Sequence, residues 1–137
     1  PPVGPPIVPS AHMNAVLFVA VGGAMGSVAR FLLSTWITRL AGHGFPLGTL
    51  TVNLLGSFAI SLFHQAGAAG LLTAEHRLFL TTGLLGGFTT YSTFNYETLT
   101  ALETGAYGIA ALNVAGTLLG CLVGGYLGLV AGRGWRG

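Results

Sequence analysis

The sequence has very few charged side chains. Only 6% of its 137 residues are charged and lysine is absent, whereas about one quarter of an ordinary soluble domain is charged. Together with a hydrophobic content of 52%, this composition indicates a membrane protein in contact with lipid. The net charge of +2 is too small and too scattered to favour nucleic acid as a partner.

Cysteine and catalytic motifs are also scarce. The single Cys121 excludes an intramolecular disulfide framework. The sequence shows no Ser/His/Asp set, no metal-spaced cluster of histidine and cysteine, no phosphate-binding loop and no G-x-S-x-G motif. We therefore do not expect an enzyme.

The N-terminal stretch PPVGPPIVPSAHM is rich in proline, which fixes φ and removes backbone donors, so it is not expected to form a helix. It also lacks the positively charged region of a signal peptide. We expect residues 1–13 to be a disordered segment, or one that is not native to the protein. Residues 14–137 are expected to form the folded domain.

Four apolar stretches follow, each close to the length of about 20 residues that a helix needs to cross a bilayer. They cover residues 15–37, 50–69, 78–102 and 107–131. The connectors between them are short and leave no room for a soluble domain. We therefore predict an all-α membrane protein of four transmembrane helices, with both termini on one side of the membrane.

The third span is unusually polar. Its segment GLLGGFTTYSTFNYETL combines glycines that weaken a helix with hydroxyls that can satisfy carbonyls freed by a break. A helix that is discontinuous in mid-membrane is the expected result, and such helices hold ion sites in channels and transporters. Phe88, Tyr91 and Phe94 share a face wherever the segment is helical. Rings at this spacing are usually core, but a ring edge can also lie against an anion.

Amides and hydroxyls also occur in the second and fourth spans. Asn53, near the start of the second span, either cross-links helices or donates at a pore entrance. Asn113, Thr117 and Cys121 share one face of the fourth span. They either bond neighbouring helices or form a line of donors beside the path of an ion that has lost its water.

Two charged residues fall inside the apolar stretches. Arg30 in the first span must reach the interface, pair with an acid or face water. Glu97 in the third span either pairs with Arg30 or accepts hydrogen bonds from the backbone around the break. The sequence leaves these alternatives open.

Glycines recur at every fourth position of the fourth span, from Gly116 to Gly132, and at Gly22 and Gly26 in the first span. Such ridges let helices approach closely, either within a subunit or between subunits. Four short helices enclose little interior of their own. We therefore expect a homo-oligomer, with any pathway lying between its subunits.

The chain resembles the Fluc (CrcB) family of fluoride channels from Asn14 onward. The resemblance is carried by GGAMGSVARF, GTLTVNLLGS, GGFTTYSTFNYET and NVAGTLLG, of which the third-span pattern is long and specific. It implies a dual-topology homodimer, with two antiparallel fluoride pores and a central structural sodium ion. It further implies export of fluoride from the cytoplasm, which reduces fluoride toxicity, across the plasma (inner) membrane of a prokaryote.

The resemblance also assigns roles to individual residues. The sodium ion would be held by the main-chain carbonyls of Gly86 and Thr89 from each subunit. The aromatic pair that lines the pore falls on Tyr91 and Phe94, with Tyr91 where the family pattern has phenylalanine. The other residues assigned to the fluoride pathway are Asn53, Ser92, Thr93, Asn113 and Thr117, and those assigned to a vestibule or a structural role are Arg30 and Glu97.

A small multidrug-type, proton-coupled transporter is the main alternative, because it too has four short spans in a dimer. That function would require a carboxylate in the first span, where this sequence has Arg30. A structural subunit of a larger membrane complex would explain the glycine ridges but not the broken, hydroxyl-rich span.

Overall fold

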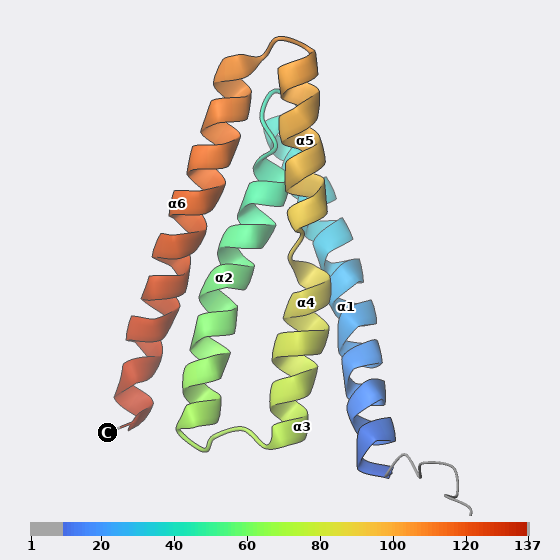
Figure 1. Ribbon diagram of the computed structural model, residues 1–137, viewed down its shortest axis with the longest axis vertical. Helices are drawn as coiled ribbons and strands as arrows, with labels where there is room; N and C mark the ends of the chain where they lie inside the picture. The colour runs from blue at the N-terminus through green and yellow to red at the C-terminus, as the bar shows by residue number, and fades with distance from the viewer. Residues whose placement is uncertain (1–9, 137) are drawn as a thin grey trace, which may run out of the picture.

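The computed structural model describes residues 10–136, and over this range it contains helices and connecting turns but no strand (Figure 1). The long helices are α1 (Ser10–Ala41), α2 (Leu47–Ala68) and α6 (Tyr107–Gly132). The shorter elements are α3 (Ala74–Arg77), the π-helix η1 (Leu78–Leu85), α4 (Gly86–Phe88), α5 (Tyr91–Glu103) and the terminal 3-10 helix η2 (Arg133–Arg136).

Within residues 10–136, three helices are long and apolar enough to cross a membrane: His12–Ala41, Leu47–Ala68 and Tyr107–Trp135. They correspond to the first, second and fourth predicted spans. The third predicted span is built from η1, α4 and α5 in succession. Its helix stops after Phe88 and starts again at Tyr91, so the predicted discontinuity is confirmed and lies at Thr89 and Thr90.

The first helix begins earlier than the sequence predicted. α1 starts at Ser10, so residues 10–13 are helical instead of belonging to the preceding segment. No proline follows Pro9 until Pro46, and the backbone donors that a helix needs are therefore present from Ser10 onward. The rest of that predicted segment, residues 1–9, lies outside the described residues.

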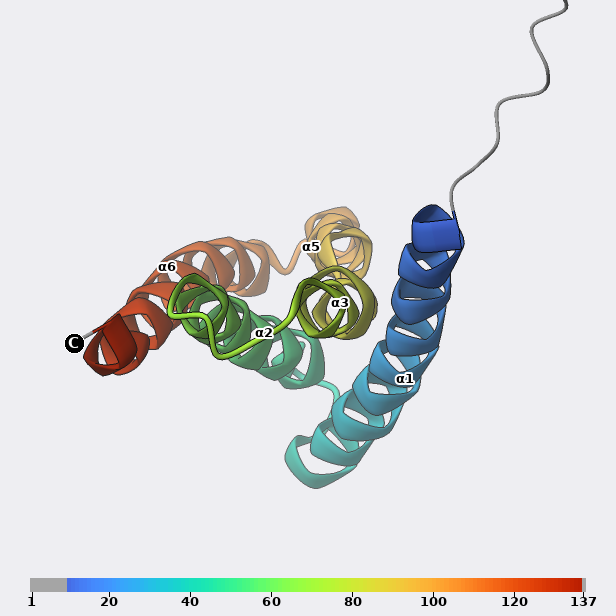
Figure 2. The same cartoon turned by 90° about the horizontal axis from the view of Figure 1, so that it is seen from below.

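The helices run along the length of the molecule, and the start of α1 and the end of α6 lie at the same end (Figure 1). α2 packs against α6, while α1 packs against η1, α4 and α2. Seen along the molecule, α1 and α6 lie on opposite sides, with α2 and the broken span between them (Figure 2). The break therefore lies at the centre of the bundle.

Glycine permits the close contact between α1 and η1. A Cβ at Gly26 would overlap the carbonyl oxygen of Leu84, and a Cβ at Gly22 would lie 2.6 Å from the carbonyl oxygen of Phe79. Gly83 returns the contact, because a Cβ there would lie 3.0 Å from the Cα of Gly22. The backbone of the third span is thus held directly against the backbone of α1.

The glycine ridge of α6 faces α2 of the same chain. A Cβ at Gly120 would lie 2.7 Å from the side chain of Leu54, and one at Gly132 would overlap that of Gln65. Gly116, in contrast, has open space around it. Most of the predicted ridge is therefore a contact with α2 within one subunit.

We expect Gly26→Ala to lower the free energy of unfolding by about 1–3 kcal/mol, because the added methyl group meets a backbone oxygen that cannot move aside. Thermal unfolding in detergent, followed by circular dichroism, measures this. Gly108→Ala on α6 is the matched control, since a Cβ there meets nothing. Equal unfolding temperatures for the two variants would contradict this account of the α1 contact.

Candidate functional site

The break in the third span is held by Asn53 of α2. Its Nδ2 donates to the carbonyl oxygen of Thr90 at 3.0 Å, and the N–H of Thr90 donates to Asn53 Oδ1 at 2.8 Å. The side-chain amide thereby satisfies both backbone polar groups of Thr90, which have no water to bond inside a bilayer. Asn53 is buried and cross-links α2 to the break.

Thr90 also starts α5. Its backbone is extended, and its Oγ1 accepts from the N–H of Thr93 at 3.3 Å, as the residue preceding a helix often does. The same oxygen donates to Thr93 Oγ1 at 3.0 Å and lies 3.4 Å from Ser92 Oγ. Three hydroxyls thus gather at the N-terminus of α5, where the helix dipole favours a negative charge.

On the other side of the break, carbonyl oxygens lose their helical partners. Because the N–H of Thr90 bonds Asn53, the carbonyl of Gly86 lacks the partner four residues later that a continuous helix would supply. The carbonyl of Thr89 accepts a long bond of 3.4 Å from Arg30 Nη1 and keeps its second lone pair. Carbonyls of an unwound segment are the usual ligands of Na⁺ in membrane helices, so the donor chemistry of these two oxygens is of the kind that a sodium site requires.

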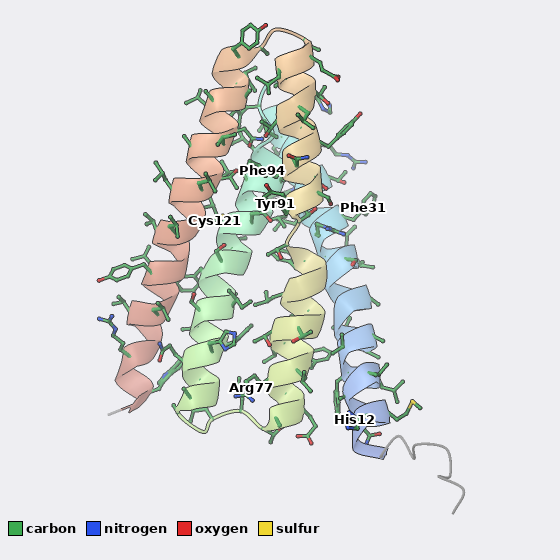
Figure 3. The ribbon with its side chains drawn as sticks, in the orientation of Figure 1. His12, Phe31, Arg77, Tyr91, Phe94 and Cys121 are labelled. Atoms are coloured by element: carbon green, nitrogen blue, oxygen red, sulfur yellow. The ribbon has the colours of Figure 1, made fainter. Side chains whose placement is uncertain are left out.

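A cavity of about 510 Å³ lies between α2, the break and α6. Six of the residues that line it are Asn53, Thr90, Tyr91, Phe94, Thr117 and Cys121. Figure 3 shows Tyr91, Phe94 and Cys121 at a similar level, near the middle of the molecule's length. The cavity therefore lies far from both ends of the bundle. This is the level at which a bilayer would contain the least water.

The cavity is open to the surface of the chain on one side. Tyr91, Leu118 and Leu122 line the cavity, yet they are 75%, 55% and 72% exposed. Large apolar side chains that line a cavity and remain this exposed form a surface that another hydrophobic surface can cover.

The two aromatic rings at the start of α5 form a pair. The ring centroids of Tyr91 and Phe94 lie 5.6 Å apart, and their planes are inclined at 55°. Phe94 is buried, with 6% of its surface exposed. Phe88 belongs to α4, before the break, so the helical spacing predicted for three rings joins only Tyr91 and Phe94.

Asn113 and Thr117 lie one turn apart on α6 but have different environments. Asn113 is 1% exposed, and its Nδ2 donates to Thr98 Oγ1 at 2.9 Å. Thr117 is 8% exposed, and its Oγ1 has no hydrogen-bond partner within residues 10–136. Four other threonines donate to the carbonyl four residues earlier, namely Thr81, Thr89, Thr98 and Thr104. The hydroxyl of Thr117 is therefore an unused donor in the cavity wall.

Arg30 and Glu97 bond different partners. Arg30 reaches the Thr89 carbonyl, whereas Glu97 Oε1 accepts from Thr49 Oγ1 at 2.6 Å. Both alternatives left open for Glu97 are thus replaced by a third, a hydroxyl of α2. Because Thr49 lies one turn before Asn53, this face of α2 holds α5 at Glu97 and the break at Thr90.

Comparison with known proteins assigns the chain to a family. Residues 17–129 match the family described as CrcB-like protein, Camphor Resistance (CrcB). The chain belongs to the CrcB-like family. Its relatives include the fluoride-specific ion channel FluC of Geobacter sulfurreducens, which is 49% identical over 88% of this chain and 98% of the relative. The protein of the same name from Opitutus terrae is 46% identical over 89% of this chain and 95% of the relative.

These CrcB-like relatives are named as ion channels, which are not enzymes. With three helices able to span a bilayer, the relationship also identifies a multi-pass membrane protein. The family membership agrees with the resemblance stated from the third-span pattern.

In this CrcB-like chain the structure brings together part of the predicted site. Tyr91, Phe94, Asn53 and Thr117 line one cavity with the carbonyl-bearing residues at the break. Three residues assigned to the pathway do not line that cavity, namely Ser92, Thr93 and Asn113.

The sequence interpretation gave no role to Thr49 or Thr98, although each makes a hydrogen bond between two helices. It counted Thr90 among the hydroxyls at the break, but it did not foresee that the backbone of Thr90 bonds Asn53. The only available signal was position. Thr49 shares a helical face with Asn53, and Thr90 directly precedes the predicted second half of the span.

Proposed function

We propose that this chain forms a fluoride-selective ion channel. The observation that carries the proposal is the buried, unused hydroxyl of Thr117, a residue that lines the same cavity as Phe94. Fluoride is strongly hydrated, so a narrow apolar path excludes it unless donors replace part of its water. A free hydroxyl and the positive edge of an aromatic ring supply such donors. The names of the relatives support fluoride as the ion.

The proposed path uses the residues around the cavity. The ion passes the edges of Tyr91 and Phe94 and the hydroxyl of Thr117, and Asn53 lies at the break beside them. Ser92 and Thr93 do not line this cavity, and their hydroxyls are proposed to act as donors next to it, at the N-terminus of α5. Arg30 and Glu97 serve as vestibule or structural residues, where Arg30 supplies a positive charge that attracts an anion.

A second copy of the chain, inserted in the opposite orientation, is proposed to complete the cavity wall. The exposed lining residues Tyr91, Leu118 and Leu122 favour this. A partner that covers them would bury their apolar surface and close the open side of the cavity. The two-fold symmetry of such a homodimer would create two equivalent pathways.

A structural sodium ion is proposed at the break, held by the carbonyl oxygens of Gly86 and Thr89. Two oxygens from each subunit of the homodimer would make a site of four hard ligands. Such a cation would hold the two breaks together. Residues 10–136 contain no cluster of three or more His, Cys, Asp or Glu side chains that could hold a metal.

The proposed physiological direction is export of fluoride from the cytoplasm across the inner membrane of a prokaryote. Hydrogen fluoride is a neutral weak acid that crosses lipid and ionises inside the cell. A passive channel then lets the trapped anion leave and reduces its toxicity.

Purified protein in liposomes tests the proposed function against its alternative. Vesicles loaded with fluoride, chloride or a lipophilic cation are diluted into medium without them, and release is followed. A fluoride channel releases fluoride and retains the other two. Release of the lipophilic cation in exchange for protons would instead favour a multidrug-type transporter.

Tyr91→Phe should leave fluoride efflux close to that of the unmodified protein. The substitution keeps the ring edge that pairs with Phe94, and the side chain of Tyr91 is 75% exposed. Efflux measured with a fluoride electrode checks this, and Tyr91→Ile provides the contrast because it removes the edge. A large loss in Tyr91→Phe would show that the phenol itself is required.

A further inference from the structure

The backbone of Phe94 is tied to α6 through a chain of two hydrogen bonds. Asn113 Nδ2 donates to Thr98 Oγ1 at 2.9 Å, and Thr98 Oγ1 donates to the carbonyl oxygen of Phe94 at 2.8 Å. We call these three residues the Asn113 relay. It joins α6 to the turn of α5 that carries the buried ring of the aromatic pair.

The chemistry of the groups fixes the direction of the relay. A threonine hydroxyl has one proton, and Thr98 uses it on the Phe94 carbonyl. Toward Asn113, Thr98 Oγ1 can therefore only accept, so the amide must present its nitrogen to Thr98. The oxygen and nitrogen of an amide have nearly the same shape, and here the hydrogen-bond partners decide which of them faces Thr98.

Two residues of the relay are buried, which makes its hydrogen bonds important for stability. Asn113 is 1% exposed and Phe94 is 6% exposed. A buried amide without a partner is destabilising, so Thr98 is the group that allows an asparagine at this place. The hydrogen bonds between Asn53 and Thr90 hold the residue that precedes α5 to α2. The relay is therefore the anchor of this turn to α6.

Resting on the fluoride channel proposed above, we propose that Thr98 and Asn113 are positioning residues for the Phe94 ring, and that Asn113 acts through Thr98 instead of binding the ion. One of its N–H groups is committed to Thr98. Its Oδ1 has no partner but is an acceptor, which cannot replace water around an anion, and its second N–H belongs to a side chain that does not line the cavity. Thr117, one turn away, lines the cavity with a free donor, whereas Asn113 does not line it.

A double-mutant cycle on fluoride efflux tests the relay. Thr98→Val removes the hydroxyl and Asn113→Leu removes the amide, each with little change of shape. Each should slow efflux by about tenfold, the effect expected for one lost hydrogen bond on the barrier. If both act on the same ring through one relay, the double variant should be no slower than the slower single variant. Multiplied effects would show that Asn113 acts on the ion independently and would overturn the proposal.

Two controls separate positioning from a general loss of structure. Thr98→Ser keeps the hydroxyl and should restore efflux. Thr104→Val deletes the same kind of bond to a carbonyl four residues earlier, but at the exposed end of α5, and should leave efflux unchanged. The rates are normalised to the amount of intact oligomer from gel filtration, and the thermal unfolding temperature of each variant is recorded.

The outcomes are distinguishable from a failure of the channel proposal. Absence of fluoride efflux in the unmodified protein would refute the channel itself, whatever the relay does. Unchanged efflux in Thr98→Val, in a protein that releases fluoride, would refute the relay alone. If Thr98→Val lowers the yield of folded protein, Thr98→Ala and Thr98→Ser form the comparison, and equal rates in these two would also overturn the proposal.

Discussion

Phe94→Ile should slow fluoride efflux by about a hundredfold or more, which corresponds to about 2.7 kcal/mol in the transport barrier. The Phe94 ring lies in the cavity wall at the middle of the molecule (Figure 3). Isoleucine keeps an apolar side chain but removes the ring edge, whose partial positive charge stabilises an anion. Fluoride efflux from liposomes, measured with an ion-selective electrode, gives the rate.

The same exchange on α1 is the control for Phe94→Ile. Phe31 is 66% exposed and does not line the cavity that contains Phe94 and Cys121. Phe31→Ile should therefore leave the rate unchanged. Because Phe94 is buried, the oligomer of Phe94→Ile is checked by gel filtration before its rate is compared. An intact oligomer with the rate of the unmodified protein would exclude the ring from the pathway.

Thr117→Val should slow efflux by about ten- to a hundredfold, because a hydrogen bond to a charged partner contributes roughly 1.5–3 kcal/mol. Valine keeps the shape of threonine and deletes its donor. The hydroxyl has no hydrogen-bond partner within residues 10–136, so its removal breaks no hydrogen bond in the folded chain. The rate is measured in the same liposome assay.

Thr117→Ser is the matched variant, since it keeps the donor and loses only a methyl group. It should stay close to the unmodified rate. If the hydroxyl served only packing, Thr117→Val would change stability by less than about 1 kcal/mol and would leave efflux as it was. That result, in an intact oligomer, would show that Thr117 has only a packing role and lies outside the ion pathway.

The fold could be predicted where it depends on local composition. The lengths of the apolar stretches predicted the spans, and the glycines and threonines from Gly83 to Thr93 predicted the break. The start of α1 was predicted too late, because the residues that follow Pro9 were expected to be non-helical like the proline-rich stretch before them. The glycine ridge predicted a helix contact for α6, but α2 could be named as its partner only from the structure.

The site could be predicted only as far as residue type allows. An asparagine in a membrane span predicts a buried hydrogen-bond partner. Which group is that partner depends on how the two helices are rotated and shifted against each other. Asn53 meets the backbone of Thr90, and Asn113 meets a threonine fifteen residues earlier on another helix. Glu97 likewise bonds Thr49 because these two helices meet there. Such pairings depend on tertiary packing, which leaves no local signal.

The most direct test of the account is the ratio of fluoride to chloride efflux from one batch of liposomes that contain the unmodified protein. If the cavity replaces the water of a small, strongly hydrated anion through the Phe94 edge and the Thr117 hydroxyl, fluoride should leave at least about a hundredfold faster than chloride. Equal rates for the two anions, or fluoride efflux no faster than from protein-free liposomes, would contradict it.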